Sequence, residues 1–150
     1  MKDRIGKSLS KKTDFTISYP KNMKNVGKYT IKIEFQGNYN GTEERDFTII
    51  PKSTSITKAV PKKKGVALKW KKQKEQVSGY EIVYSTDKKF RKNVKLKIIG
   101  SAKTNAYSLT KLKSGKRYYV KICTYKKVNV DGKATKIYSE WCKVKTFVVK

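Results

Sequence analysis

The sequence contains no histidine, only two cysteines and 11 acidic residues among 150. Without histidine, the chain lacks the usual general base and the commonest metal ligand. Two cysteines cannot complete a structural zinc site by themselves. Neither a glycine-rich phosphate loop nor a Gly-x-Ser-x-Gly elbow occurs. The acidic cluster at 43–46 is interpreted as a solvated lead-in to a strand. We therefore predict no catalytic residue, no metal site and no cofactor.

Long hydrophobic runs are also missing. No stretch approaches the ~20 apolar residues of a membrane-spanning helix. The first four residues, Met1-Lys2-Asp3-Arg4, lack the apolar segment of a secretory signal. If the parent protein is exported, we expect its signal and its anchor to lie outside this sequence. Hydrophobic residues make up 37% and aromatic residues 11%, which is enough apolar material for packed cores.

Positive charge dominates: 38 basic residues give a net charge of +27. Only Arg4, Arg45, Arg91 and Arg117 are arginines. Arginine presents a planar fork to base edges, whereas lysine is a flexible point charge. We therefore expect no specific nucleic-acid recognition. Two interpretations of the lysines stay open: they attract an anionic polymer with a salt-sensitive affinity, or they keep a β-rich surface soluble.

Apolar residues recur at every second position, which is the period of a β-strand. In the first third this alternation predicts three short strands, around 15–19, 29–35 and 47–49. The sequence Asn40-Gly41-Thr42 fits a glycosylation sequon, but we interpret it as a turn with a positive φ at Gly41.

The pattern restarts after Pro51-Lys52-Ser53, so we predict two domains, 1–52 and 53–150. The first carries 11 basic and 6 acidic residues, and the second carries 27 and 5. Seven strands are expected in the second domain, near 55–60, 65–72, 79–85, 94–99, 105–110, 117–126 and 136–149. Seven short alternating strands are typical of a β-sandwich.

Several spaced residues of 53–150 resemble a fibronectin type III domain. Trp70 matches the buried tryptophan of that family, and Tyr80 and Tyr84 match the aromatic residues of its third strand. The sequence Leu112-Lys113-Ser114-Gly115-Lys116-Arg117-Tyr118 resembles the tyrosine corner, with Ser114 replacing the usual proline. The resemblance implies that Tyr118 packs inward and that its hydroxyl bonds to backbone upstream. The fold class expected is all-β, a fibronectin type III-like seven-stranded sandwich plus a partial Ig-like module.

Near the end, Tyr138-Ser139-Glu140-Trp141-Cys142 resembles the Trp-Ser-x-Trp-Ser box of some fibronectin-type domains. The resemblance implies that Trp141 stacks on Lys121 or on the ring of Tyr119. It also places Cys123 and Cys142 on neighbouring strands, where they replace the usual Arg and Ser. We name Cys123 and Cys142 as a candidate disulfide; the alternative is two independent thiols.

The sequences of residues 85–90 and 118–121 resemble lysine-rich repeats on exported proteins of low-GC Gram-positive bacteria. Residues 14–49 resemble the C-terminal half of an Ig-like repeat from the same proteins. A partial sandwich leaves strand edges unpaired, so we expect the first domain either to associate with a second copy or to be the least stable part. Light scattering at low and high concentration would separate the two.

The leading hypothesis is a non-catalytic structural or adhesive module of a secreted or cell-surface protein. It would act as a spacer or interaction domain, with cell-wall polymer or a host or neighbouring surface protein as partner. The alternatives are a polyanion-binding module, with anionic cell-wall polymer, glycosaminoglycan or nucleic acid as its ligand, and an ancillary domain of a surface hydrolase. The candidate polyanion contacts are Lys62, Lys63, Lys64, Lys71 and Lys72.

Overall fold

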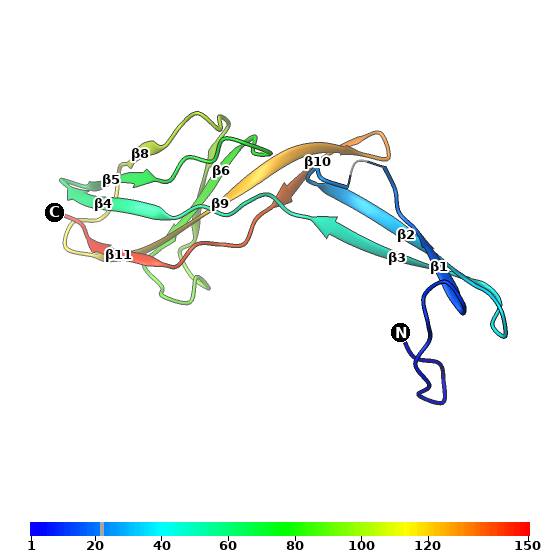
Figure 1. Cartoon of the computed structure of the whole chain (residues 1–150). Helices are drawn as coiled ribbons and strands as arrows, with labels where there is room; N and C mark the ends of the chain where they lie inside the picture. Colours follow the sequence, from blue (N-terminus) through cyan, green and yellow to red (C-terminus); the bar gives the residue numbers. More distant parts are fainter. Residues whose placement is uncertain (22) are drawn as a thin grey trace. The chain divides into compact units, whose positions relative to one another are not determined.

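The computed structural model describes residues 1–21 and 23–150, and its regular elements there are all β-strands (Figure 1). The all-β fold class is thereby confirmed. None of the described segments forms a helix that is long and apolar enough to cross a membrane. The chain divides into two compact units, Met1–Ile49 (unit 1) and Ile50–Lys150 (unit 2). The boundary between them along the chain falls after residue 49, slightly before residue 52, where the sequence predicted the first domain to end.

Unit 1 is one antiparallel sheet of three strands in the order β1-β2-β3. The strands are β1 (Phe15–Ser18), β2 (Gly27–Phe35) and β3 (Thr42–Ile49). All three lie where the alternation predicts them, and β3 starts earlier than expected. The β2–β3 turn contains Gly41 at a φ of 100°, a left-handed conformation that favours glycine, as predicted.

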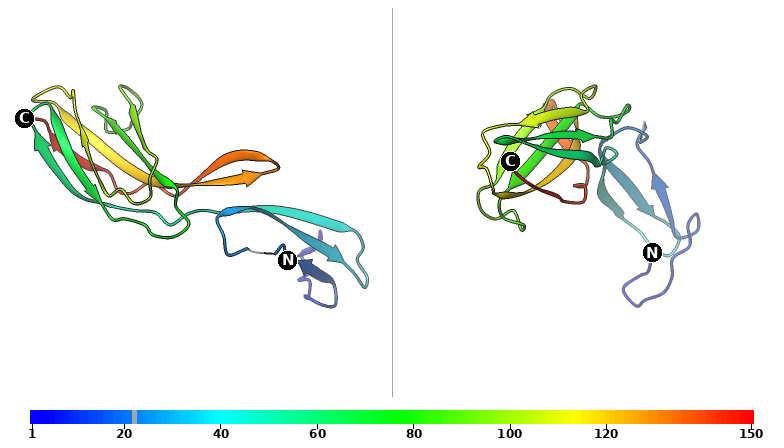
Figure 2. Two further views of the ribbon diagram at one scale, coloured as in Figure 1. Left: turned by 90° about the horizontal axis from the view of Figure 1, so that it is seen from above. Right: turned by 90° about the vertical axis from the view of Figure 1, so that its left-hand side faces the viewer.

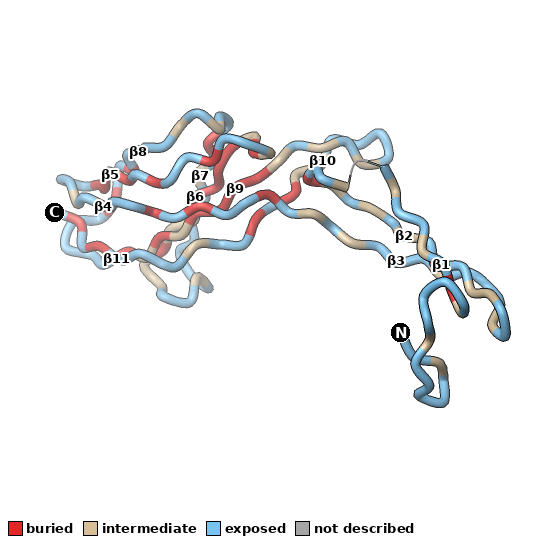
Figure 3. The backbone as a smooth tube through the Cα atoms, viewed as in Figure 1, coloured by how far each residue is buried: buried red, intermediate tan, exposed pale blue. Residues whose placement is uncertain are grey.

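The register of unit 1 gathers its apolar side chains on one face. Phe15 lies opposite Phe35, and Tyr29 lies opposite Phe47 with the two rings stacked at 5.5 Å. Among the described residues of unit 1, the buried apolar side chains are Phe15, Val26 and Ile33. Unit 1 is therefore a single layer with a thinly covered apolar face, and Figure 3 shows few buried positions along it. Its self-association remains a prediction.

Unit 2 is a two-layer sandwich, seen from two further sides in Figure 2. Its strands are β4 (Ile56–Lys62), β5 (Gly65–Trp70), β6 (Gly79–Ser85), β7 (Lys95–Ile99), β8 (Ala106–Leu109), β9 (Arg117–Val130), β10 (Lys133–Tyr138) and β11 (Lys145–Val148). One sheet has the order β4-β5-β8. The other has the order β10-β9-β6-β7, and β11 also pairs with β9.

The last predicted strand, 136–149, is two strands in the structure, so unit 2 has eight strands where seven were expected. β9 continues to Val130 and turns into β10 through Asp131 and Gly132, whose φ values are 51° and 78°. Two successive positive φ values are the geometry of a tight hairpin turn, which Asp-Gly favours. This dipeptide was the sequence signal that the prediction missed.

Apolar side chains of both sheets fill the interior of the sandwich. The core cluster consists of Ile56, Val66, Leu68, Trp70, Val77, Tyr80, Ile82, Ile99, Leu109, Leu112, Tyr118, Val120, Ile122, Phe147 and Val149. Tyr118, Val120 and Ile122 of β9 are among them. The opposite face of β9 is also covered, because Cys123 and Tyr125 are 0% and 1% exposed.

The tyrosine corner predicted from residues 112–118 is present. The backbone N–H of Lys113 donates a hydrogen bond to the Tyr118 hydroxyl at 3.2 Å. The Tyr118 ring packs between Tyr84 and Phe147, with centroid distances of 6.5 and 5.9 Å. Gly115 lies in the turn with a φ of 72°, a left-handed conformation that favours glycine. The corner therefore fixes how the chain enters β9.

Candidate interaction surfaces

The five lysines proposed as polyanion contacts do not lie together. Lys62 ends β4, and Lys63 and Lys64 form the turn that leads into β5. Lys71 and Lys72 follow the other end of β5. The six residues of β5 span roughly 20 Å at the strand rise. All five side chains are exposed. The turn at 62–64 and the pair at 71–72 therefore belong to opposite ends of the sandwich.

A cation-π ladder crosses the outer face of β9. The Lys121 ammonium lies 4.8 Å from the Trp141 ring centroid and 4.6 Å from the Phe90 ring centroid. The contact with Trp141 is the one that the resemblance implied. Phe90 comes from the β6–β7 loop and was missed, because no periodicity marks an aromatic residue inside a lysine-rich loop. Contacts of this kind contribute about 1 kcal/mol each at partly exposed sites.

Glu81 is a buried carboxylate beside this ladder, only 8% exposed. Lys136 Nζ lies 3.2 Å from its Oε1, and the Tyr138 hydroxyl donates a hydrogen bond to the same oxygen at 2.9 Å. Burial and this hydrogen bond raise the pKa of the Tyr138 hydroxyl. Sequence reasoning did not single out Glu81 or Lys136. Their arrangement neutralises a buried charge, as a structural carboxylate requires.

Cys123 and Cys142 are both free thiols in the structure, and the candidate disulfide between them remains a prediction. The Cys142 sulfur instead accepts the backbone N–H of Ile122 at 3.3 Å. Ser139 does the same with its hydroxyl, which accepts the Thr124 N–H at 3.0 Å. Cys142 also packs partly against the core cluster. Along β9, the side chains of Ser139 and Cys142 thus accept backbone N–H bonds that the carbonyls of a continuous strand would accept. This explains the break between β10 and β11.

We expect alkylation to distinguish the two cysteines. Burial, followed by the nearby charge of Glu81, raises the pKa of the Cys123 thiol to about 12. Because the thiolate is the nucleophile, iodoacetamide at pH 8 should label Cys142 and spare Cys123 in the native chain. Between pH 9 and 12 the unfolded thiol loses its proton while the native one keeps it, so stability should fall as pH rises.

Mass spectrometry after labelling counts the modified cysteines. Without reductant, two labels should appear in denaturant. A denatured, unreduced chain with no reactive thiol would establish the bridge between Cys123 and Cys142 and contradict the structure.

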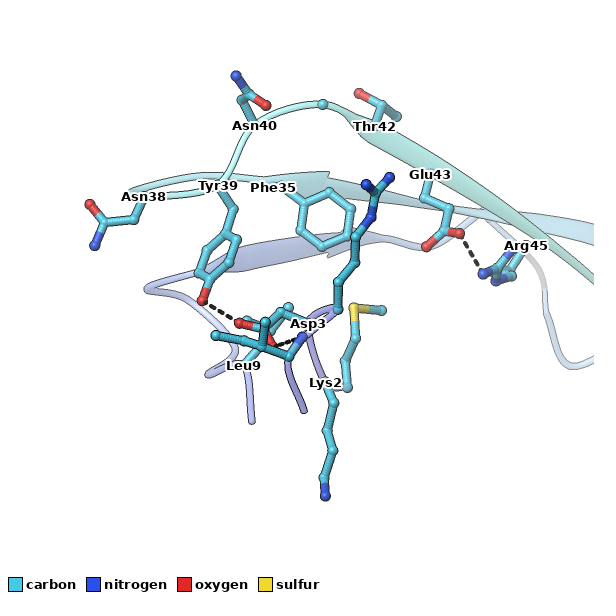
Figure 4. Close-up of a pocket in the computed structure, with 14 residues that line it drawn as sticks. Lys2, Asp3, Leu9, Phe35, Asn38, Tyr39, Asn40, Thr42, Glu43 and Arg45 are labelled. Atoms are coloured by element: carbon cyan, nitrogen blue, oxygen red, sulfur yellow. Dashed lines mark hydrogen bonds and ion pairs between the residues drawn. The ribbon is translucent and has the colours of Figure 1, made fainter. Parts of the chain in front are cut away.

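Unit 1 contains an open hollow of about 910 Å³ (Figure 4). Its carboxylates already have partners: Asp3 accepts hydrogen bonds from the Tyr39 hydroxyl at 3.3 Å and the Lys7 N–H at 2.8 Å, and Glu43 pairs with Arg45. Burial and the neighbouring Asp3 raise the pKa of Tyr39. The hollow therefore does not present paired carboxylates arranged for acid-base chemistry. Among the described residues, no group of three or more His, Cys, Asp or Glu side chains is placed to hold a metal ion.

Comparison with known proteins gives a family and a fold. The family described as "Fibronectin type III domain" matches residues 50–139. No curated protein matches the sequence. Among solved structures, the chicken CNTN1 FN1-FN3 domains are similar, with a TM-score of 0.53 and 14% identity over 84% of this chain. The match spans 42% of that chain, and at this identity the likeness concerns the fold alone.

Proposed function

Because the chain belongs to the fibronectin type III domain family through residues 50–139, we propose that it is a non-catalytic structural and adhesive module of an exported bacterial cell-surface protein. Domains of this family are typically structural or interaction modules. The role proposed is that of a spacer that holds neighbouring domains away from the surface, or of an interaction domain in its own right.

The observation that carries this proposal is the filled interior of unit 2. Fully buried side chains, such as Val66, Ile82 and Val120 at 0% exposure, occupy the space between the sheets. Hydrogen bonds tie the loops to this core, including the tyrosine corner and the bond from Thr124 Oγ1 to the Lys52 carbonyl at 2.8 Å. A packed sandwich with anchored loops resists deformation, as a spacer requires.

The surface location is supported by the resemblance of residues 85–90 and 118–121 to repeats of exported proteins. For unit 1, we propose the C-terminal half of an Ig-like repeat, supported by its single antiparallel layer and its apolar face. A second layer would cover that face.

An antibody against residues 50–150 tests the location on intact cells that make the full-length parent protein. Labelling of intact cells, and loss of that labelling after external protease treatment, is the expected result. Labelling that requires lysis would overturn the proposed location. Replacing residues 50–150 with an unrelated sandwich of equal length then tests the role: a spacer tolerates the exchange, whereas an interaction domain loses its ligand.

A further inference from the structure

One end of unit 2 is built from loops that are rich in lysine. The turn at 62–64 and the loop at 111–116 are joined there, because the Leu112 N–H donates to the Lys64 carbonyl at 2.9 Å. The Lys64 N–H in turn donates to the Lys150 carbonyl at 2.9 Å, and the Gly115 N–H donates to the Val149 carbonyl at 2.9 Å. These bonds fix the two loops against the end of the chain and against each other.

A third basic loop, residues 86–94, leaves β6 at the same end. The register places Ser85, the last residue of β6, opposite Tyr119, which lies close to the start of β9. The 111–116 loop enters β9 at that start. Because β6 and β9 are antiparallel, the 86–94 loop begins beside the place where the 111–116 loop ends.

The 86–94 loop is ordered by its one carboxylate. Asp87 accepts backbone N–H bonds from Lys89 at 3.0 Å, Arg91 at 2.9 Å and Lys92 at 3.2 Å. The bonds from the backbone of Lys89 and Arg91 lower the pKa of Asp87. Its charge therefore organises the loop backbone, and the basic side chains of the loop remain exposed.

We call the exposed basic residues of the three loops the basic end. They are Lys62, Lys63, Lys64, Lys88, Lys89, Arg91, Lys92, Lys111, Lys113 and Lys116. Asp87 is the sole acidic residue within residues 61–65, 86–94 and 110–117. The basic end therefore concentrates positive charge from three loops that are far apart in the sequence. Lys71 and Lys72 are not part of it.

We infer that the basic end binds a linear phosphodiester polymer that carries no bases. Lysine dominates over arginine there, and point charges suit repeated phosphates without a fixed register. Single-stranded nucleic acid would be held additionally by stacking on aromatic rings. The one aromatic residue of these loops, Phe90, already lies 4.6 Å from the Lys121 ammonium. This inference rests on the interaction role proposed above and names its partner class.

Synthetic poly(glycerol phosphate) is the probe, titrated into the full chain over a range of salt concentrations. The test variant carries Lys62→Gln, Lys63→Gln and Lys113→Gln. The matched control carries Lys71→Gln, Lys72→Gln and Lys74→Gln at the opposite end of the sandwich. Both variants lose three charges from exposed positions, so they have the same net charge. Circular dichroism checks that both remain folded.

If each lysine contacts one phosphate, the negative slope of log affinity against log salt should become shallower by about 2 in the test variant, at roughly 0.7 for each contact in a flexible strand. The control should keep the slope and the affinity of the unmodified chain. Equal losses in the two variants would mean that net charge alone attracts the polymer and would overturn the inference.

Single-stranded DNA with the same number of phosphates separates the two sources of phosphodiester. Affinity for DNA no higher than for poly(glycerol phosphate) is expected. Tenfold tighter binding to DNA would show that bases contribute and would also overturn the inference. Surface labelling of cells does not depend on either result, so failure of the location and failure of the polymer site remain distinguishable.

Discussion

Replacement of Gly79 by alanine should lower the free energy of unfolding of unit 2 by about 3 kcal/mol, the upper part of the range for overpacking. Gly79 starts β6 and pairs with Tyr125 of β9. A Cβ atom at this position would overlap the Ile99 carbonyl oxygen and lie 2.7 Å from the Tyr125 hydroxyl. The carbonyl belongs to the backbone of the neighbouring strand, so neither strand can yield without loss of pairing.

Gly100→Ala is the matched control, because a Cβ atom there has no atom within 4 Å. Urea titration of the full chain, followed by tryptophan fluorescence, measures both variants, and both tryptophans belong to unit 2. The midpoint should fall for Gly79→Ala with an unchanged m-value and should hardly move for Gly100→Ala. Equal midpoints for the two variants would show that β6 can shift to accept the methyl group.

Replacement of Tyr80 by phenylalanine should cost about 3 kcal/mol although it removes a single oxygen atom, because a buried backbone N–H and a partly buried backbone carbonyl lose their partner. The Tyr80 hydroxyl accepts the Gln73 N–H at 3.0 Å and donates to the Ala102 carbonyl at 3.1 Å. Tyr80 is fully buried and Gln73 is nearly so, which keeps water from replacing the bonds. The hydroxyl joins the segments that follow β5 and β7.

Tyr84→Phe provides the comparison on the same strand. Within the described part of the chain the Tyr84 hydroxyl has no hydrogen-bond partner, and its ring is half-buried. This variant should keep the stability of the unmodified chain to within about 0.5 kcal/mol. A loss for Tyr80→Phe as small as that for Tyr84→Phe would mean that Gln73 and Ala102 find other partners.

The sequence allowed the strands, the corner and part of the ladder to be predicted. Two-residue alternation located the strands because a half-buried strand must place alternate side chains in the core. Tyr118 and Trp141 were predictable from local motifs, since each makes its contact through a short segment with a characteristic spacing. These features depend on neighbours in the sequence or on a pairing that the motif itself implies.

The separation of Lys71 and Lys72 from Lys62–Lys64 was also predictable, because the predicted strand 65–72 has Lys71 and Lys72 at its far end.

Other features of the fold depended on which strands pair and where they end. The burial of Cys123 could not be predicted, because it depends on which strand pairs with β9: Cys123 lies opposite Glu81 of β6. Ser139 and Cys142 interrupt the last strand through side-chain acceptors, which leave no trace in hydrophobic periodicity.

The pairing of β9 has a consequence for how the sandwich can vary. β6 pairs with β9 only as far as Tyr125, so residues 126–130 pair with β10 alone and form a two-stranded arm that ends at Asp131 and Gly132 (Figure 1). β11 closes the sandwich separately, by pairing with residues 117–120. Insertions at the tip of the arm would lengthen it without touching the residues that fill the interior. The arm is thus a place where related chains can differ in length at little cost to folding.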